Sequence, residues 1–138
     1  MTMDSPQQLS LGVSLDDDAR FSNFFCFPDS PNAQTLNALM SQLSPEGEPF
    51  IFLWGGSGLT HLLQAACHSA SADGLSVQYL PLMELQSFDP DSLFEGLEEM
   101  DLVCIDDVQA IAGKPAWETA LFALFNQLRD RGVGLLMA

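Results

Sequence analysis

Residues Leu102–Asp107, with the sequence LVCIDD, decide the fold, because four apolar residues lead directly into two adjacent carboxylates. A strand made only of apolar residues is buried on both faces, which is typical of a parallel sheet covered by helices on each side. Carboxylates placed directly after such a strand can hold a metal-bound phosphate. We therefore expect Asp106 and Asp107 to form one half of a nucleotide site.

The other half is predicted at an earlier strand, residues 50–54, which runs into the glycine-rich turn and helix start Gly55–His61, GGSGLTH. In a P-loop, Gly-x-x-x-x-Gly-Lys-[Ser/Thr] wraps phosphates in backbone N–H groups and the lysine reaches the terminal ones. Here Gly55 and Gly58 stand three apart, and Leu59 takes the lysine's place. The pattern indicates a weakened site, and it requires that the turn and the acid pair lie on neighbouring parallel strands.

Apolar strands alternate with amphipathic helices along the rest of the chain, which predicts an α/β domain with three layers and a parallel sheet. We expect strands at 50–54, 77–80, 102–105 and 134–138, and helices at about 30–43, 60–72, 90–97 and 115–131. Residues 1–20 are expected to form a flexible arm and residues 21–138 the folded domain. A buried strand at the last residues predicts a fragment or a truncated product.

Composition and charge argue against some classes of function for this chain, nucleic-acid binding among them. The chain has 138 residues, of which 19 are acidic and 4 basic, giving a net charge of −15. Such a polyanion repels nucleic acid, so we expect no direct DNA or RNA binding. No apolar run is long enough to span a membrane, and no secretory signal opens the chain, so we expect a cytoplasmic protein. Cys26, Cys67 and Cys104 show no disulfide or metal spacing and are expected to be reduced, packed thiols.

The motif LVCIDDVQAIAG at Leu102–Gly113, followed by Trp117-Glu118, Leu124–Asn126 and Leu128, resembles the AAA+ module of the DnaA family of replication initiators. It is most similar to the Hda branch of that family. The resemblance covers most of residues 7–138 and implies a P-loop AAA+ fold. It also implies that the last strand, the sensor residues, the arginine finger and the helical lid are absent from this chain.

The resemblance implies three groups of site residues. The phosphates and adenine of ADP or ATP, bound weakly if at all, would contact Gly56, Gly58, Thr60, His61, Phe24 and Asn32. Mg²⁺ bound with the nucleotide would be held at Thr60, Asp106 and Asp107. An N-terminal peptide resembling a sliding-clamp-binding motif would use Gln8, Leu9 and Leu11.

The sequence departs from the family pattern in the shortened glycine turn, in Leu59, and in Asn32, which lies two residues further from Phe24. We therefore expect a regulator of chromosomal replication initiation without ATPase activity of its own. Its partners would be the DNA polymerase sliding clamp and DnaA, whose ATP-bound form it would help to inactivate. Two alternatives remain: a weak P-loop ATPase of the DnaA type, and an acidic phosphoacceptor domain resembling response-regulator receivers. The second needs acidic residues after the first strand, where this chain has Trp54-Gly55.

Overall fold

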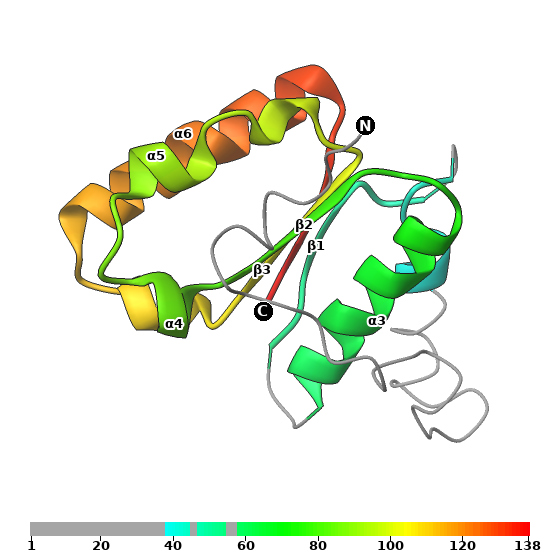
Figure 1. Cartoon of the computed structure of the whole chain (residues 1–138), viewed down its shortest axis with the longest axis horizontal. Coiled ribbons are helices and arrows are strands. Elements are labelled where there is room, and N and C mark those ends of the chain that lie inside the picture. Colours follow the sequence, from blue (N-terminus) through cyan, green and yellow to red (C-terminus); the bar gives the residue numbers. More distant parts are fainter. Residues whose placement is uncertain (1–37, 45–46, 55–57) are drawn as a thin grey trace.

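The computed structural model describes residues 38–44, 47–54 and 58–138. Its sheet separates two layers of helices (Figure 1). In chain order the elements are β1 (Phe50–Phe52), α3 (Leu59–Ala72), β2 (Val77–Pro81), α4 (Leu82–Leu85), α5 (Pro90–Phe94), the 3₁₀ turn η2 (Leu97–Glu99), β3 (Leu102–Asp106), the 3₁₀ turn η3 (Val108–Ile111), α6 (Pro115–Arg131) and β4 (Gly134–Met137). Residues 38–40 are also helical. The predicted three-layer α/β class is confirmed.

All strand pairs are parallel, and the order across the sheet is β1-β4-β3-β2. The prediction that the strand before the glycine turn and the strand before the acid pair are neighbours is wrong, because β4 pairs with both and lies between them. The physical reason is burial. Leu135 and Leu136 of β4 are only 1% and 0% exposed, which a strand achieves when other strands flank it and helices cover it.

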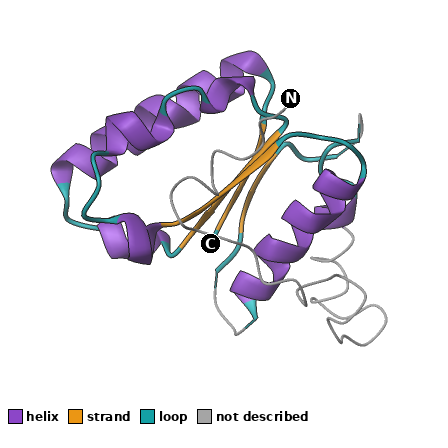
Figure 2. Ribbon diagram, in the orientation of Figure 1, coloured by secondary structure: helices purple, strands orange, loops and turns teal. Residues whose placement is uncertain are grey.

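The helices divide unequally between the two faces of the sheet. Helix α3 covers one face, whereas α4, α5 and α6 lie on the other, as the strands seen between the helix layers in Figure 2 show. Helix α3 presents a stripe of buried residues to the sheet: Leu62, Leu63, Ala65, Ala66, Cys67 and Ala70. Both Cys67 and Cys104 are buried and free of disulfides, as expected, while Cys26 lies outside the described residues.

Helix α6 has the predicted bounds. Pro115 stands in its first turn, and Gly132 ends it with a φ of 72°, in the left-handed region that glycine adopts without strain. Trp117 fixes this helix to its own layer, since its ring meets Phe94 edge to face at 5.7 Å and its Nε1 donates to the carbonyl of Gln86 at 3.1 Å. The buried Trp117 indole therefore connects α6 to α5 and to Gln86, the residue that follows α4.

Two short elements were not predicted from the sequence, and one predicted helix is shorter than expected. Helix α4 and η3 each contain four residues, too few for a helical period to be visible. The helix expected at 90–97 ends at Phe94, because Glu95 is extended and Gly96 has a φ of 85°. No helix within the described ranges has the length and apolar character needed to cross a bilayer.

Candidate functional site

The predicted site lies at the carboxyl ends of the strands, where α3 begins. The Thr60 hydroxyl, on the first turn of α3, donates a hydrogen bond of 2.7 Å to Oδ2 of Asp106 at the end of β3. The helix that follows the glycine turn therefore reaches over β4 to the acid pair. The two sequence segments do share one location, although a strand separates the strands that carry them.

Asp106 is held by three donors from three different directions. Its Oδ2 accepts from Thr60 and from the Tyr79 hydroxyl at 2.8 Å, and its Oδ1 accepts from the backbone N–H of Asp107 at 2.9 Å. The residue is only 3% exposed. A buried carboxylate is tolerated when such hydrogen bonds replace water. The arrangement thus holds the oxygen atoms of Asp106 in a fixed orientation at the end of β3.

Tyr79 of β2 is a site residue that the sequence did not suggest. It is 3% exposed, and its hydroxyl also accepts from Nε2 of Gln64 at 3.3 Å. Burial, with the negative charges of Asp106 and Asp107, raises the pKa of the Tyr79 phenol far above its ordinary value of 10.0, against a lowering contribution from Gln64. The phenol therefore stays protonated and remains a donor. A tyrosine in an apolar strand is usually predicted to be a core residue, so the sequence contained only a weak signal for a role of Tyr79 in the site.

Asp107 adopts a backbone conformation that non-glycine residues rarely take, with a φ of 60°. It occupies the N-cap position of η3, but its side chain makes no capping hydrogen bond there, so the structural alternative of a capping role is wrong. Partial burial, followed by the charge of Asp106, raises the pKa of the Asp107 carboxyl. Backbone strain of this kind concentrates at functional sites. Asp107 thus has an unusual backbone conformation at the predicted site, and its side chain interacts with Gln109 of the same turn.

We expect Asp107→Asn to stabilise the metal-free protein at neutral pH. The folded protein holds the Asp107 proton more tightly than the unfolded chain does, so its stability falls as the pH rises from the ordinary pKa of 3.8 through the raised one. Asparagine tolerates the same backbone and carries no charge. Urea unfolding at a series of pH values should show an advantage of the variant that is largest at pH 7 and narrows toward pH 4. A constant or inverted difference would contradict the raised pKa.

The phosphate side of the site begins at Gly58, the N-cap of α3, whose φ is 84°. In the part of the chain that the structure describes, no side chain caps α3 and its first turn contains no acidic residue. A helix start of this kind leaves backbone N–H groups for an anion. His61 follows Thr60 on the same turn and is half-buried. Gly56, Phe24 and Asn32 lie outside the described residues, as do Gln8, Leu9 and Leu11 of the predicted clamp-binding peptide.

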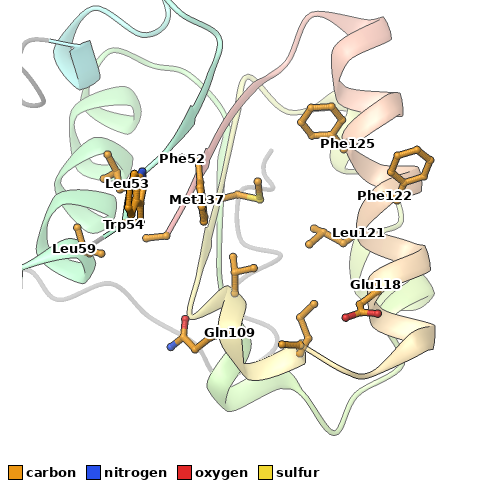
Figure 3. Close-up of a pocket in the computed structure, with 14 residues that line it drawn as sticks. Phe52, Leu53, Trp54, Leu59, Gln109, Glu118, Leu121, Phe122, Phe125 and Met137 are labelled. Carbon is orange, nitrogen blue, oxygen red and sulfur yellow. The ribbon is translucent and has the colours of Figure 1, made fainter. Parts of the chain in front are cut away.

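Leu59, which stands where a P-loop has its lysine, lines an apolar cavity of about 750 Å³ instead (Figure 3). The cavity lies between the start of α3, the ends of β1 and β4, and α6, and its walls include Phe52, Trp54 and Phe122. Its single charged lining residue within the described chain, Glu118, accepts a hydrogen bond from the backbone N–H of Gly113 at 2.8 Å. None of the described residues that line the cavity is a cation that could bind a phosphate.

The side chains assembled around Asp106 fit a hard cation. Thr60, Asp106 and Asp107 supply only oxygen atoms, which Mg²⁺ prefers. Among the described residues, no group of three or more His, Cys, Asp or Glu side chains could hold a metal alone. Mg²⁺ is usually bound by one or two carboxylates together with substrate phosphates. The site is thus suited to a cation that arrives with a phosphate, and not to a permanent metal centre.

Comparisons with known proteins identify a matching family and similar folds. Residues 15–138 match the family described as the bacterial DnaA ATPase domain. Domain III of the Thermotoga maritima replication initiation protein DnaA superposes with a TM-score of 0.71 at 30% identity, over 91% of this chain and 57% of that chain. AMPPCP-bound DnaA from Aquifex aeolicus gives a TM-score of 0.71 at 26% identity, over 90% of this chain and 43% of the other.

A third similar structure is the replication initiator DnaA bound to AMPPCP and single-stranded DNA, with a TM-score of 0.71 at 26% identity over 90% of this chain and 42% of that one. The chain thus spans about half of these solved structures, or somewhat less. This relative is bound to single-stranded DNA, so the expectation that the present chain binds no DNA or RNA is not supported.

Proposed function

This chain belongs to the bacterial DnaA ATPase-domain family, and from that premise we propose that it binds ATP or ADP weakly, together with Mg²⁺, where α3 begins beside Asp106. The family is that of replication initiation proteins, and two similar DnaA structures contain the ATP analogue AMPPCP. Membership also removes the receiver-like alternative, which belongs to another class of α/β protein.

The hydrogen bond between Thr60 and Asp106 carries the proposal. Thr60 donates its proton to Asp106, so its oxygen lone pairs remain available to a cation. Asp106 and Asp107 would hold the water molecules around that cation, and the N–H groups at the start of α3 would contact a phosphate. Bound Mg²⁺ would neutralise phosphate charge beside the two carboxylates. Each of these residues therefore has a binding task and none needs to transfer a proton.

The affinity is proposed to be low because of Leu59. A lysine at this position would make a charge-assisted hydrogen bond to a phosphate, and losing one such bond costs about 1.5–3 kcal/mol, or roughly 10- to 150-fold in affinity. The net charge of −15 further disfavours a polyanionic ligand. The nucleotide would serve a structural or regulatory role, and we propose that the chain does not hydrolyse ATP.

An equilibrium titration with AMPPCP, in Mg²⁺ and in EDTA, tests the binding. We expect saturable binding that is measurably tighter in Mg²⁺, and no steady ATP turnover above background in a parallel assay. Asp107→Ala serves as the control for turnover. Absence of saturable binding would contradict the nucleotide site, and turnover that disappears in Asp107→Ala would contradict the non-enzymatic role.

We further propose that the chain acts as a negative regulator of the Hda type, docking on the DNA polymerase sliding clamp and promoting inactivation of ATP-bound DnaA. The support is the sequence of the N-terminal arm, where Gln8, Leu9 and Leu11 match the expected spacing of a polar and two apolar anchors. An extended peptide of this kind binds through alternate side chains placed in pockets.

A peptide spanning Gln7–Val13 is expected to bind the sliding clamp in solution. Replacing Gln8 and Leu11 together by alanine should weaken binding by more than about 100-fold, because truncating an anchor in a buried pocket removes 2 kcal/mol or more. Replacing the neighbouring Gln7 and Ser10 is the matched control and should leave the dissociation constant nearly unchanged. Equal dissociation constants for the wild-type and doubly substituted peptides would exclude the arm as the docking segment.

A further inference from the structure

Tyr79 of β2 and Gln64 of α3 form a hydrogen-bonded connection to Asp106 of the acid pair. The Tyr79 hydroxyl donates to Asp106 Oδ2 at 2.8 Å and accepts from Gln64 Nε2 at 3.3 Å. Thr60 and Gln64 lie one turn apart on α3 and therefore project from the same side of that helix. Tyr79 and Asp106 are hydrogen-bonded to each other, and α3 contacts both of them. Thr60 bonds to Asp106, and Gln64 bonds to Tyr79.

The strand register explains how Tyr79 reaches Asp106. In the pairing of β2 with β3, Tyr79 lies opposite Cys104, and Pro81 lies opposite Asp106. Residues two apart on a strand share a face, so Tyr79 and Asp106 both lie on the face that α3 covers. The phenol spans the two-residue offset diagonally. Tyr79 and Asp106 are each 3% exposed, so little water competes for this contact.

A phenylalanine would fill nearly the same volume without placing a polar group in the core. A buried hydroxyl that finds no partner destabilises the fold, so its presence here is explained by the bonds it makes. The bond to Asp106 orients that carboxylate directly, and the bond from Gln64 orients the phenol. The carboxylate oxygen Oδ2 is consequently fixed from β2 and α3 at once, and its remaining lone pairs point in a defined direction.

We propose that Tyr79 is a positioning residue of the cation site, which orients the Asp106 carboxylate for Mg²⁺ and is itself oriented by Gln64. This inference rests on the proposed nucleotide function and adds a residue to it. Partners that orient metal-binding groups from outside typically change metal affinity by about 10- to 100-fold when they are removed. Tyr79 would act on the cation through Asp106 and without touching it.

The test is the Mg²⁺ dependence of AMPPCP binding in Tyr79→Phe, measured with the full chain. We expect the Mg²⁺ concentration for half-maximal enhancement to rise by about tenfold or more, while AMPPCP affinity in EDTA stays unchanged. Cys104→Ala is the matched control, because it disturbs the packing directly opposite Tyr79 without removing a donor to Asp106. Its Mg²⁺ dependence should equal that of the wild type.

Gln64→Leu provides a second variant should Tyr79→Phe fail to fold, and it should shift the Mg²⁺ dependence in the same direction by a smaller factor. Normal Mg²⁺ dependence in the folded Tyr79→Phe or Gln64→Leu protein would overturn the positioning role and leave the nucleotide site standing. Absence of any Mg²⁺ effect in the wild type would overturn both. An equal shift in Cys104→Ala would show a packing effect and also overturn the positioning role.

Discussion

Replacing Trp117 with alanine is expected to lower the free energy of unfolding by about 3–5 kcal/mol. The indole is 4% exposed, packs edge to face on Phe94, and donates from Nε1 to the Gln86 carbonyl. Alanine would leave a cavity between α6 and α5 and an unpaired carbonyl after α4. Urea unfolding followed by circular dichroism measures the loss.

Trp117→Phe separates the two contributions of this side chain. Phenylalanine keeps much of the ring packing against Phe94 but cannot donate to Gln86, so we expect a loss well below that of alanine. A loss below about 1 kcal/mol for Trp117→Ala would show that the helix layer is not fixed at this residue. Neither the ring contact of Trp117 with Phe94 nor its hydrogen bond to Gln86 involves the acid pair, so the substitution tests the fold.

The second large effect is expected at Asp106. Asp106→Asn keeps the shape of the side chain and an acceptor for Tyr79 or Thr60, but removes the charge that faces the cation. We expect AMPPCP affinity in Mg²⁺ to fall by about 10- to 100-fold, with affinity in EDTA nearly unchanged. Isothermal titration calorimetry under both conditions measures this difference.

Asp101→Asn is the matched control for that experiment. Asp101 lies just before β3, at the opposite end of the strand, where its carboxylate accepts from the backbone and side chain of Ser76. The Asp101→Asn variant reduces the net negative charge of the chain by the same amount as Asp106→Asn without changing the site. Its Mg²⁺ dependence should therefore equal that of the wild type. An equal loss in both variants would indicate a general charge effect and not a cation site at Asp106.

The sequence predicted the parallel sheet and the bounds of α6 because these depend on local signals. An all-apolar strand such as Leu102–Ile105 can be satisfied only between two helix layers. Pro115 and Gly132 mark the two ends of α6 by their backbone preferences. The position of Asp106 at the end of β3 was also predicted, because the apolar run of the strand stops there.

The strand order and the role of Tyr79 were not predictable in the same way. Chain order does not state which strands pair, and β4 enters between β1 and β3 although it comes last. Tyr79 joins the site through its register with β3, which appears only once β2 and β3 are paired. The short turn η3 follows the left-handed backbone of Asp107. The presence of an aspartate does not by itself predict that conformation.

A crystal structure of the chain with AMPPCP and Mg²⁺ tests the proposed site most directly. We expect the phosphates at the start of α3, near Gly58 and Thr60, with the cation beside Thr60 and close to the carboxylates of Asp106 and Asp107. AMPPCP seated in the apolar cavity beside α6, with no cation at Asp106, would contradict the proposal.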